Sequence, residues 1–189
     1  VFVDIRDQET SGERRFEVNF AKKEDEPLAR RIGSVMARLH WLGVDYLGVP
    51  AGRAGTNVWL ARDGEAGAEE SGGNIWIHAI DTPRAPAEWL RELAHEYSHT
   101  TLPTLGPFSK PERWANGYVG ERLYLKWMLH DNLQTDVWSE PIDAEGYIAN
   151  QVTPLRDLFL AEGPSSPRAE LTDAEGMNFL IGQFMALEA

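Results

Sequence analysis

The sequence contains no cysteine, few basic residues and no long apolar segment. Without cysteine there is no disulfide, no thiolate metal ligand and no cysteine nucleophile, so histidines and carboxylates are left as metal ligands. Lys and Arg number 18 against 30 Asp and Glu, and a formal charge of -12 makes nucleic acid a poor partner. No apolar run approaches the roughly 20 residues that cross a bilayer, so we expect no membrane span.

The composition favours one folded unit. Of 189 residues, 42% are hydrophobic and 10% aromatic, which is enough for a core. We expect a main domain over residues 1–135 and a helical C-terminal part over 136–189 packed on the same domain. No basic-then-apolar leader follows Val1, so any targeting segment would have been removed or lie upstream. A secreted or cell-envelope location is slightly favoured over a cytoplasmic one.

Hydrophobic periodicity predicts an α+β fold with a small N-terminal mixed sheet. Apolar and polar residues alternate in strands expected at 14–20, 57–61 and 74–80. Apolar residues at helical spacing predict helices at 27–42, 86–100 and 111–130, followed by a helical C-terminal part. The acidic, Gly- and Ala-rich stretch 63–73 is expected to be a mobile surface loop.

One motif carries chemistry: His95-Glu96-Tyr97-Ser98-His99. Two histidines four residues apart lie on one helix face, about 40° apart in projection, so both imidazoles can bind one ion. The apolar arc of this helix points the opposite way, and Glu96 lies beside the histidines, where it can act as general base. The competing interpretation is a solvated His/Glu face. The arc consists of Trp89, Leu90, Leu93, Ala94 and Tyr97.

With this motif, the stretch from Trp89 to His99 resembles the active-site helix of the zincin metallopeptidases. The resemblance implies a zincin-like fold, one Zn²⁺ ion, a peptide or protein substrate, and an edge strand at 74–80 that pairs with that substrate. Metzincins have a Gly and a third His where Leu102 and Leu105 stand, and peptide deformylases need a Cys ligand. The remaining similarity is to gluzincins, in which a Glu on the next helix completes the zinc site.

Three residues are candidates for that third ligand. Glu121 projects into the apolar arc of the helix expected from Pro111, where a carboxylate is costly unless a cation or a donor compensates it. We therefore prefer Glu121, with pairing to a core arginine as the alternative. Glu112 would lie in the first turn, where the helix dipole explains an acid. Asn116 would replace the ligand if 114–118 were the analogue of the aminopeptidase Trp-x-x-Glu-Gly motif, and the chain would then be a weakened enzyme.

Four further residues are candidates for accessory roles. Gluzincins usually stabilise the oxyanion with a Tyr or His, for which Tyr147 and His130 are available. Trp76 and His78, on the expected edge strand, are candidate substrate-binding residues, and Trp76 could also stack on a sugar. Core packing of Tyr147 and Trp76 and a surface position for His78 are the alternatives. The leading hypothesis is a zinc metallopeptidase. A weakened zincin-fold protein that binds protein or glycan is the second, and an unrelated helical binding domain with an accidental motif is the third.

Overall fold

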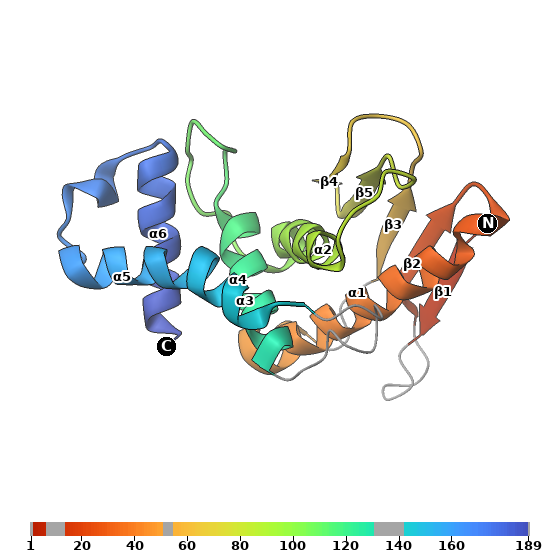
Figure 1. The fold of residues 1–189 in the computed structure, drawn as a ribbon, viewed down its shortest axis with the longest axis horizontal. Coiled ribbons are helices and arrows are strands. Elements are labelled where there is room, and N and C mark those ends of the chain that lie inside the picture. The colour runs from red at the N-terminus through yellow and green to blue at the C-terminus, as the bar shows by residue number, and fades with distance from the viewer. Residues whose placement is uncertain (1, 7–13, 51–54, 131–141, 189) are drawn as a thin grey trace.

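The computed structural model describes residues 2–6, 14–50, 55–130 and 142–188 (Figure 1). The strands are β1 (Phe2–Arg6), β2 (Arg14–Phe20), β3 (Thr56–Leu60), β4 (Gly67–Ser71) and β5 (Asn74–His78). The main helices are α1 (Glu26–Leu47), α2 (Pro86–Thr101), α3 (Asn116–His130), α5 (Thr153–Glu162) and α6 (Ala174–Leu187). Short helical turns are η1 (Lys23–Asp25), α4 (Ala144–Tyr147), η3 (Ile148–Val152) and η4 (Pro167–Glu170). The predicted α+β class is confirmed.

The strands form one mixed sheet in the order β1-β2-β3-β5-β4. The inner pairs β2–β3 and β3–β5 are parallel, whereas the outer pairs β1–β2 and β4–β5 are antiparallel. β5 is therefore an inner strand, and the prediction that 74–80 forms the edge is wrong. On this side of the sheet the edge strand is β4, which lies within 63–73, the segment predicted to be a loop.

β4 exists because a tight turn folds it back onto β5. Gly72 and Gly73 separate the two strands, and both have a positive φ, of 60° and 81°. Two such residues in a two-residue hairpin loop are typical of a type I′ turn, whose twist matches that of the paired strands. Glu69, Glu70 and Ser71 are not hydrophobic, so the alternation that reveals inner strands is missing from this edge strand.

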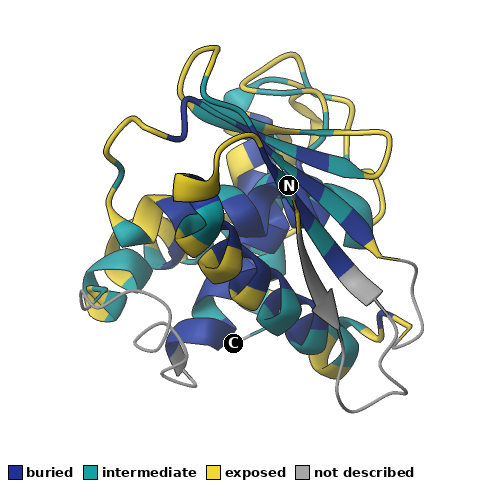
Figure 2. Ribbon diagram, turned by 90° about the vertical axis from the view of Figure 1, so that its right-hand side faces the viewer, coloured by how far each residue is buried: buried dark blue, intermediate teal, exposed yellow. Residues whose placement is uncertain are grey.

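The core lies between one face of the sheet and the helices. Phe16, Val18 and Phe20 of β2 are buried and alternate with half-buried Glu17 and Asn19. This alternation of buried and half-buried positions continues across the inner strands (Figure 2). α1 and α2 cover the buried face. α1 does so with an apolar stripe that comprises Ile32, Val35, Met36 and Leu39.

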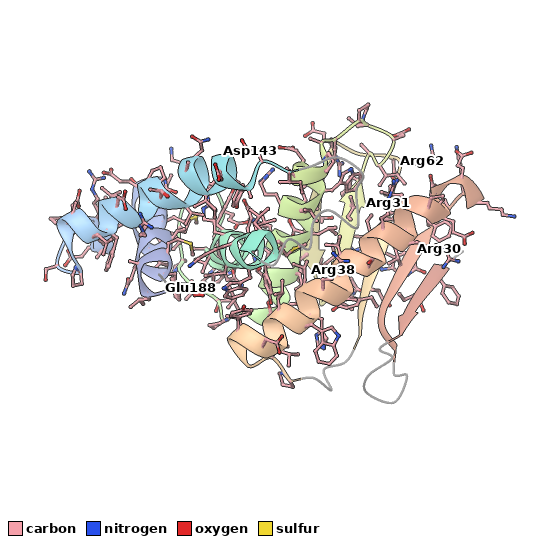
Figure 3. The ribbon with its side chains drawn as sticks, turned by 60° about the horizontal axis from the view of Figure 1, so that its bottom comes forward. Arg30, Arg31, Arg38, Arg62, Asp143 and Glu188 are labelled. Atoms are coloured by element: carbon pink, nitrogen blue, oxygen red, sulfur yellow. The ribbon has the colours of Figure 1, made fainter. Side chains whose placement is uncertain are left out.

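The helix boundaries differ from the predicted ones by more than one residue at two places. α1 runs five residues past its expected end at 42, and Gly48 then ends it with a left-handed φ of 66°. Its start is held by Arg62, which lies 2.5 Å from Asp25 and 2.8 Å from Glu24 (Figure 3). α3 begins at Asn116 rather than 111.

The C-terminal helices pack on α3. Gly182 of α6 approaches α5 so closely that a Cβ would lie 2.2 Å from the carbonyl oxygen of Leu155. Glu188 accepts hydrogen bonds from Lys126 Nζ at 3.0 Å and Trp127 Nε1 at 2.8 Å, which ties the end of α6 to α3. The expected boundary at 135/136 lies within 131–141, outside the described residues. Among the helices described, none has the length and apolarity to cross a bilayer.

Candidate metal centre

α2 positions the two histidines as its periodicity predicts. The five residues of its apolar arc are all buried in the core. On the other side, the rings of His95 and His99 meet edge to face, with centroids 5.0 Å apart and planes at 69°. His95 and Glu96 are each only 8% exposed, so a fully solvated His/Glu face is not what the helix presents.

Each imidazole is oriented through its Nδ1 atom by a side chain of α3. His95 Nδ1 lies 3.2 Å from Glu121 Oε2, and His99 Nδ1 lies 3.1 Å from Asn116 Oδ1. When Nδ1 donates its proton to such an oxygen, the neutral ring keeps its lone pair on Nε2. This hydrogen bond also fixes the ring orientation, as the outer partners of metal-binding histidines do. Glu121 and Asn116 are therefore arranged as positioning residues.

The carboxylate that the two Nε2 atoms share belongs to Glu112. Oε1 of Glu112 lies 3.2 Å from His95 Nε2, and Oε2 lies 3.7 Å from His99 Nε2. The ligand atoms of these three residues all fall within 4.8 Å of one another, so the group could hold a metal ion. Glu112 Oε1 is buried without a hydrogen bond in the described part of the chain, as expected for an oxygen that a cation would satisfy.

Glu112 was predicted to lie in the first turn of a helix, and that prediction is wrong. Residues 105–115 form a closed loop in which Phe108 N donates to Arg113 O at 2.8 Å and Ala115 N donates to Leu105 O at 2.7 Å. These bonds use backbone groups that a helix from 111 would need. The helix dipole therefore does not account for Glu112. Pro107 and Pro111, each preceded by a cis peptide bond, are the sequence signal for a loop here.

Gly117 of α3 keeps the space next to both Nε2 atoms open. A Cβ at this position would lie 2.4 Å from His95 Nε2 and 2.5 Å from His99 Nε2, far inside van der Waals contact. The two rings can hold their positions only because residue 117 has no side chain. One turn later, Gly120 lets Ser98 of α2 approach equally closely, so small residues bring α3 against the histidine face.

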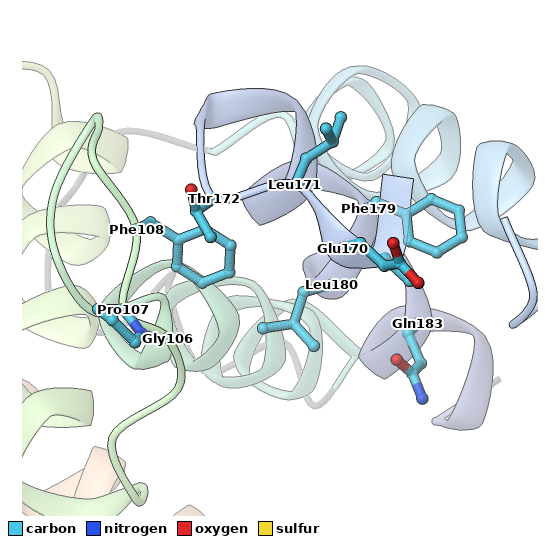
Figure 4. Close-up of a pocket in the computed structure, with 11 residues that line it drawn as sticks. Gly106, Pro107, Phe108, Glu170, Leu171, Thr172, Phe179, Leu180 and Gln183 are labelled. Atoms are coloured by element: carbon cyan, nitrogen blue, oxygen red, sulfur yellow. The ribbon is translucent and has the colours of Figure 1, made fainter. Parts of the chain in front are cut away.

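The loop that carries Glu112 is braced by the C-terminal part of the chain. Ser109 N donates to Thr172 O at 2.6 Å. Beside this contact, a cavity of about 300 Å³ separates Gly106, Pro107 and Phe108 from η4 and α6 (Figure 4). The C-terminal helical part therefore supports the loop that carries the Glu112 carboxylate.

Electrostatics tie Glu96 to the edge strand. The backbone N–H of Glu70, on β4, donates to the Glu96 carboxylate. Burial nevertheless raises the pKa of Glu96 to about 7, and the attraction of His95 only partly offsets this. A carboxyl group with such a pKa can take up and release a proton near neutral pH.

The two histidines respond differently to their surroundings. Burial lowers the pKa of His95, but the hydrogen bonds that its ring donates to Glu112 and Glu121 outweigh burial and raise the pKa to about 9. Burial holds the pKa of His99 below its ordinary value, and the nearby charge of His95 adds to this effect. Without a metal, the shared carboxylate therefore favours a proton on His95, which is the place that a cation would take.

Glu121, the residue preferred as third ligand, is 2% exposed, as its place in the apolar arc predicts. Its oxygens contact His95 Nδ1, the hydroxyl of Tyr147 at 3.4 Å and Arg91 at 3.7 Å. These donors compensate the buried charge. An arginine is thus among the partners of Glu121, but Arg91 is 39% exposed rather than a core residue. Burial, with the negative charge of Glu121, raises the pKa of Tyr147 above its ordinary range.

The predicted substrate-binding residues lie elsewhere. Trp76 and His78 project from β5 on the face opposite to buried Ile75 and Ile77, and therefore away from α2. Trp76 stacks on Trp59, and His78 Nε2 lies 3.4 Å from Glu69 Oε1. They do not line the candidate metal centre, because they project from the sheet face opposite to α2. The side chain of His130 is outside the described part of the structure.

Two nitrogen ligands and one oxygen ligand suit Zn²⁺ in a site that keeps one coordination position open. The same set also accepts other divalent transition metals, so its chemistry points to a metal without selecting one. No protein-family model matches the chain, and no curated protein is similar to it in sequence.

Proposed function

We propose that the chain is a zinc metallopeptidase in which His95, His99 and Glu112 bind one ion and Glu96 is the general base. The supporting observation is that two Nε2 atoms converge on one carboxylate while each Nδ1 atom is already bonded to a side chain. When bound, Zn²⁺ supplies Lewis acidity toward a water molecule and toward a carbonyl oxygen. The zincin-like character of the fold is part of this proposal.

Glu96 provides the proton transfer. Its carboxylate is buried beside the two histidines and is held by the Glu70 N–H, so its oxygens have a fixed direction. It removes a proton from the attacking water and returns that proton to the nitrogen of the departing amine. A dication bound next to it would favour the charged form and so prepare it to accept the proton.

We propose that the substrate binds as an extended peptide along β4. Ala68 and Glu70 pair with Ile77 and Ile75, and the two-residue turn places them at positions whose backbone groups point away from β5. Glu96 uses the N–H of Glu70, which leaves the N–H of Ala68 and both carbonyl oxygens at the open edge. A peptide can add to such an edge as a further strand.

The test combines metal analysis with hydrolysis of a broad peptide library. We expect one zinc ion per chain and measurable cleavage, both followed by mass spectrometry. Glu96→Gln should keep the zinc ion and lose about 10²–10⁴-fold in rate, because only the proton acceptor is removed. Glu88→Gln is the matched control, because Glu88 is exposed in the first turn of the same helix.

Two outcomes would contradict the proposal. Full activity in Glu96→Gln would exclude this mechanism, and absence of zinc from the wild-type protein would exclude the site. Zinc binding without turnover of any library peptide would instead support the alternative function, a zincin-fold protein that binds a partner without cleaving it.

A further inference from the structure

The face of the sheet opposite α1 and α2 carries an aromatic row that the proposed reaction does not use. The strand register aligns one residue from each strand, because direct cross-strand neighbours project from the same face. Phe2 is 57% exposed, and the rings of Trp59 and Trp76 stack 5.2 Å apart with planes at 14°. In spatial order, the row is Phe2, Asn19, Trp59, Trp76 and Glu69.

A polar row runs beside the aromatic row. It consists of Glu17, Asn57, Asn74 and Ser71, again one residue from each neighbouring strand. Asn57 Nδ2 donates to Asn74 Oδ1 at 3.1 Å, so these two carboxamides hold each other in place. In both rows, no lysine or arginine is present among the side chains that the structure describes. Along these two rows, the described side chains combine aromatic rings with carboxamides and carboxylates, and none of them offers a cation to a polyanion.

The aromatic row is hollowed at Asn19. A cavity of about 260 Å³ is lined by Asn19, Phe20, Ala21, Trp59 and Leu60. Asn19 is the neighbour of Trp59 on the side away from Trp76, so it lies next to the ring face that Trp76 leaves uncovered. The Nδ2 atom of Asn19 is buried and has no hydrogen-bond acceptor among the described residues. A buried donor without an acceptor is costly, so rotation of this carboxamide toward a ligand oxygen in the hollow, which Asn19 lines, would be favourable.

We propose that this face is a carbohydrate-binding site for a neutral sugar chain, with one sugar ring in the hollow against Trp59. The C–H groups on one side of a pyranose form an apolar surface that fits an indole ring, and its hydroxyls need acceptors and donors at the rim. Asn19 Nδ2 donates to a hydroxyl oxygen, and the polar row supplies carboxamide and carboxylate groups to neighbouring sugars. A negatively charged glycan is disfavoured because Glu17 and Glu69 flank the rings.

The experiment titrates the full chain with cellohexaose, chitohexaose and mannohexaose, followed by calorimetry and tryptophan fluorescence. At least one hexasaccharide should bind saturably and change the fluorescence. Trp59→Ala should weaken that binding by about tenfold or more, and Asn19→Ala should weaken it less. Trp41→Ala is the matched control, because Trp41 is a half-buried tryptophan on α1 and should leave binding unchanged.

The proposal is overturned if none of the three sugars binds, or if Trp59→Ala binds as tightly as the wild-type protein. Melting temperatures of all variants show whether a loss of binding reflects unfolding, and Trp76→Ala provides a second variant of the stacked pair. A protein that forms a dimer dissociated by Trp59→Ala, without sugar binding, would assign the face to a second copy and would equally overturn the proposal.

Discussion

Substitution of Gly117 by alanine tests the geometry of the metal centre most directly. The added Cβ would lie 2.4 Å from His95 Nε2 and 2.5 Å from His99 Nε2, whereas unbonded heavy atoms need about 3.5 Å. The rings or α3 must therefore move by roughly 1 Å. Metal–ligand distances vary by only about 0.2 Å, so we expect zinc affinity to fall by about 100-fold or more.

Thermal unfolding gives this loss a magnitude. At free zinc of about 1,000 times the dissociation constant, the ion stabilises the wild-type protein by about 4.1 kcal/mol. For a chain of this size that is a rise in Tm of about 8–16 °C. A 100-fold weaker site leaves about 1.4 kcal/mol and a rise of about 3–6 °C.

Gly182→Ala is the control for a steric clash away from the site, because its Cβ would meet Leu155 O at 2.2 Å. We expect this variant to melt earlier without metal and to keep the full zinc-induced shift. If Gly117→Ala kept the wild-type shift, the two Nε2 atoms would not be the ligands and the site would have to be rebuilt.

The remaining predictions concern the carboxylates around the two histidines. Glu121→Gln should weaken zinc binding by about 10–100-fold, and Glu112→Gln should weaken it more, because only the second variant removes the charge of a proposed ligand. Isothermal titration with zinc measures both affinities. The reverse order would make Glu121 the ligand. The metal-free protein should lose stability between pH 4.5 and 9. The folded-state pKa of Glu96 is raised from 4.5 to about 7, and that of His95 from 6.5 to about 9. For each group, stability that is present below the unfolded-state pKa is lost as pH rises through the folded-state pKa. Urea titrations across this range should show a flatter profile for Glu96→Gln, and an unchanged profile would contradict the burial of Glu96. Apparent zinc affinity should increase with pH up to about 9, since binding displaces a proton from His95, and calorimetry in buffers of different ionisation enthalpy should detect that proton.

Much of the fold follows from periodicity in the sequence, because burial against a sheet or a helix leaves a repeat of 2 or 3.6 residues. β2 matches the predicted 14–20, and α2 differs from the predicted 86–100 by one residue. β4 has no such repeat, because an edge strand buries little. Its evidence in the sequence is the Gly72-Gly73 pair, which lies at the end of the segment predicted to be a loop.

The third ligand of the proposed site, Glu112, could not be identified from periodicity. The apolar arc correctly predicts that Glu121 is buried, and a buried acid requires compensation. The sequence does not show whether a metal ion or the combination of His95, Arg91 and Tyr147 compensates the charge, since Arg91 is on α2 and Tyr147 is far along the chain. Glu112 was one of the three candidates but was not preferred, because the helix dipole was expected to explain its charge. Long-range backbone bonds, rather than local propensity, place it in a loop instead.

The proposed ligands therefore come from elements that are held in place to different degrees. His95 and His99 are held by a packed helix and by two hydrogen bonds from α3, so their geometry is set by the core. Glu112 depends on a loop that is closed by its own backbone bonds and braced by Ser109 against Thr172. Because the carboxylate would contribute both a ligand and a charge, we expect the Ser109–Thr172 contact to affect metal affinity as well as stability. Through Thr172, the C-terminal helical part thus helps to position the carboxylate of the proposed metal centre.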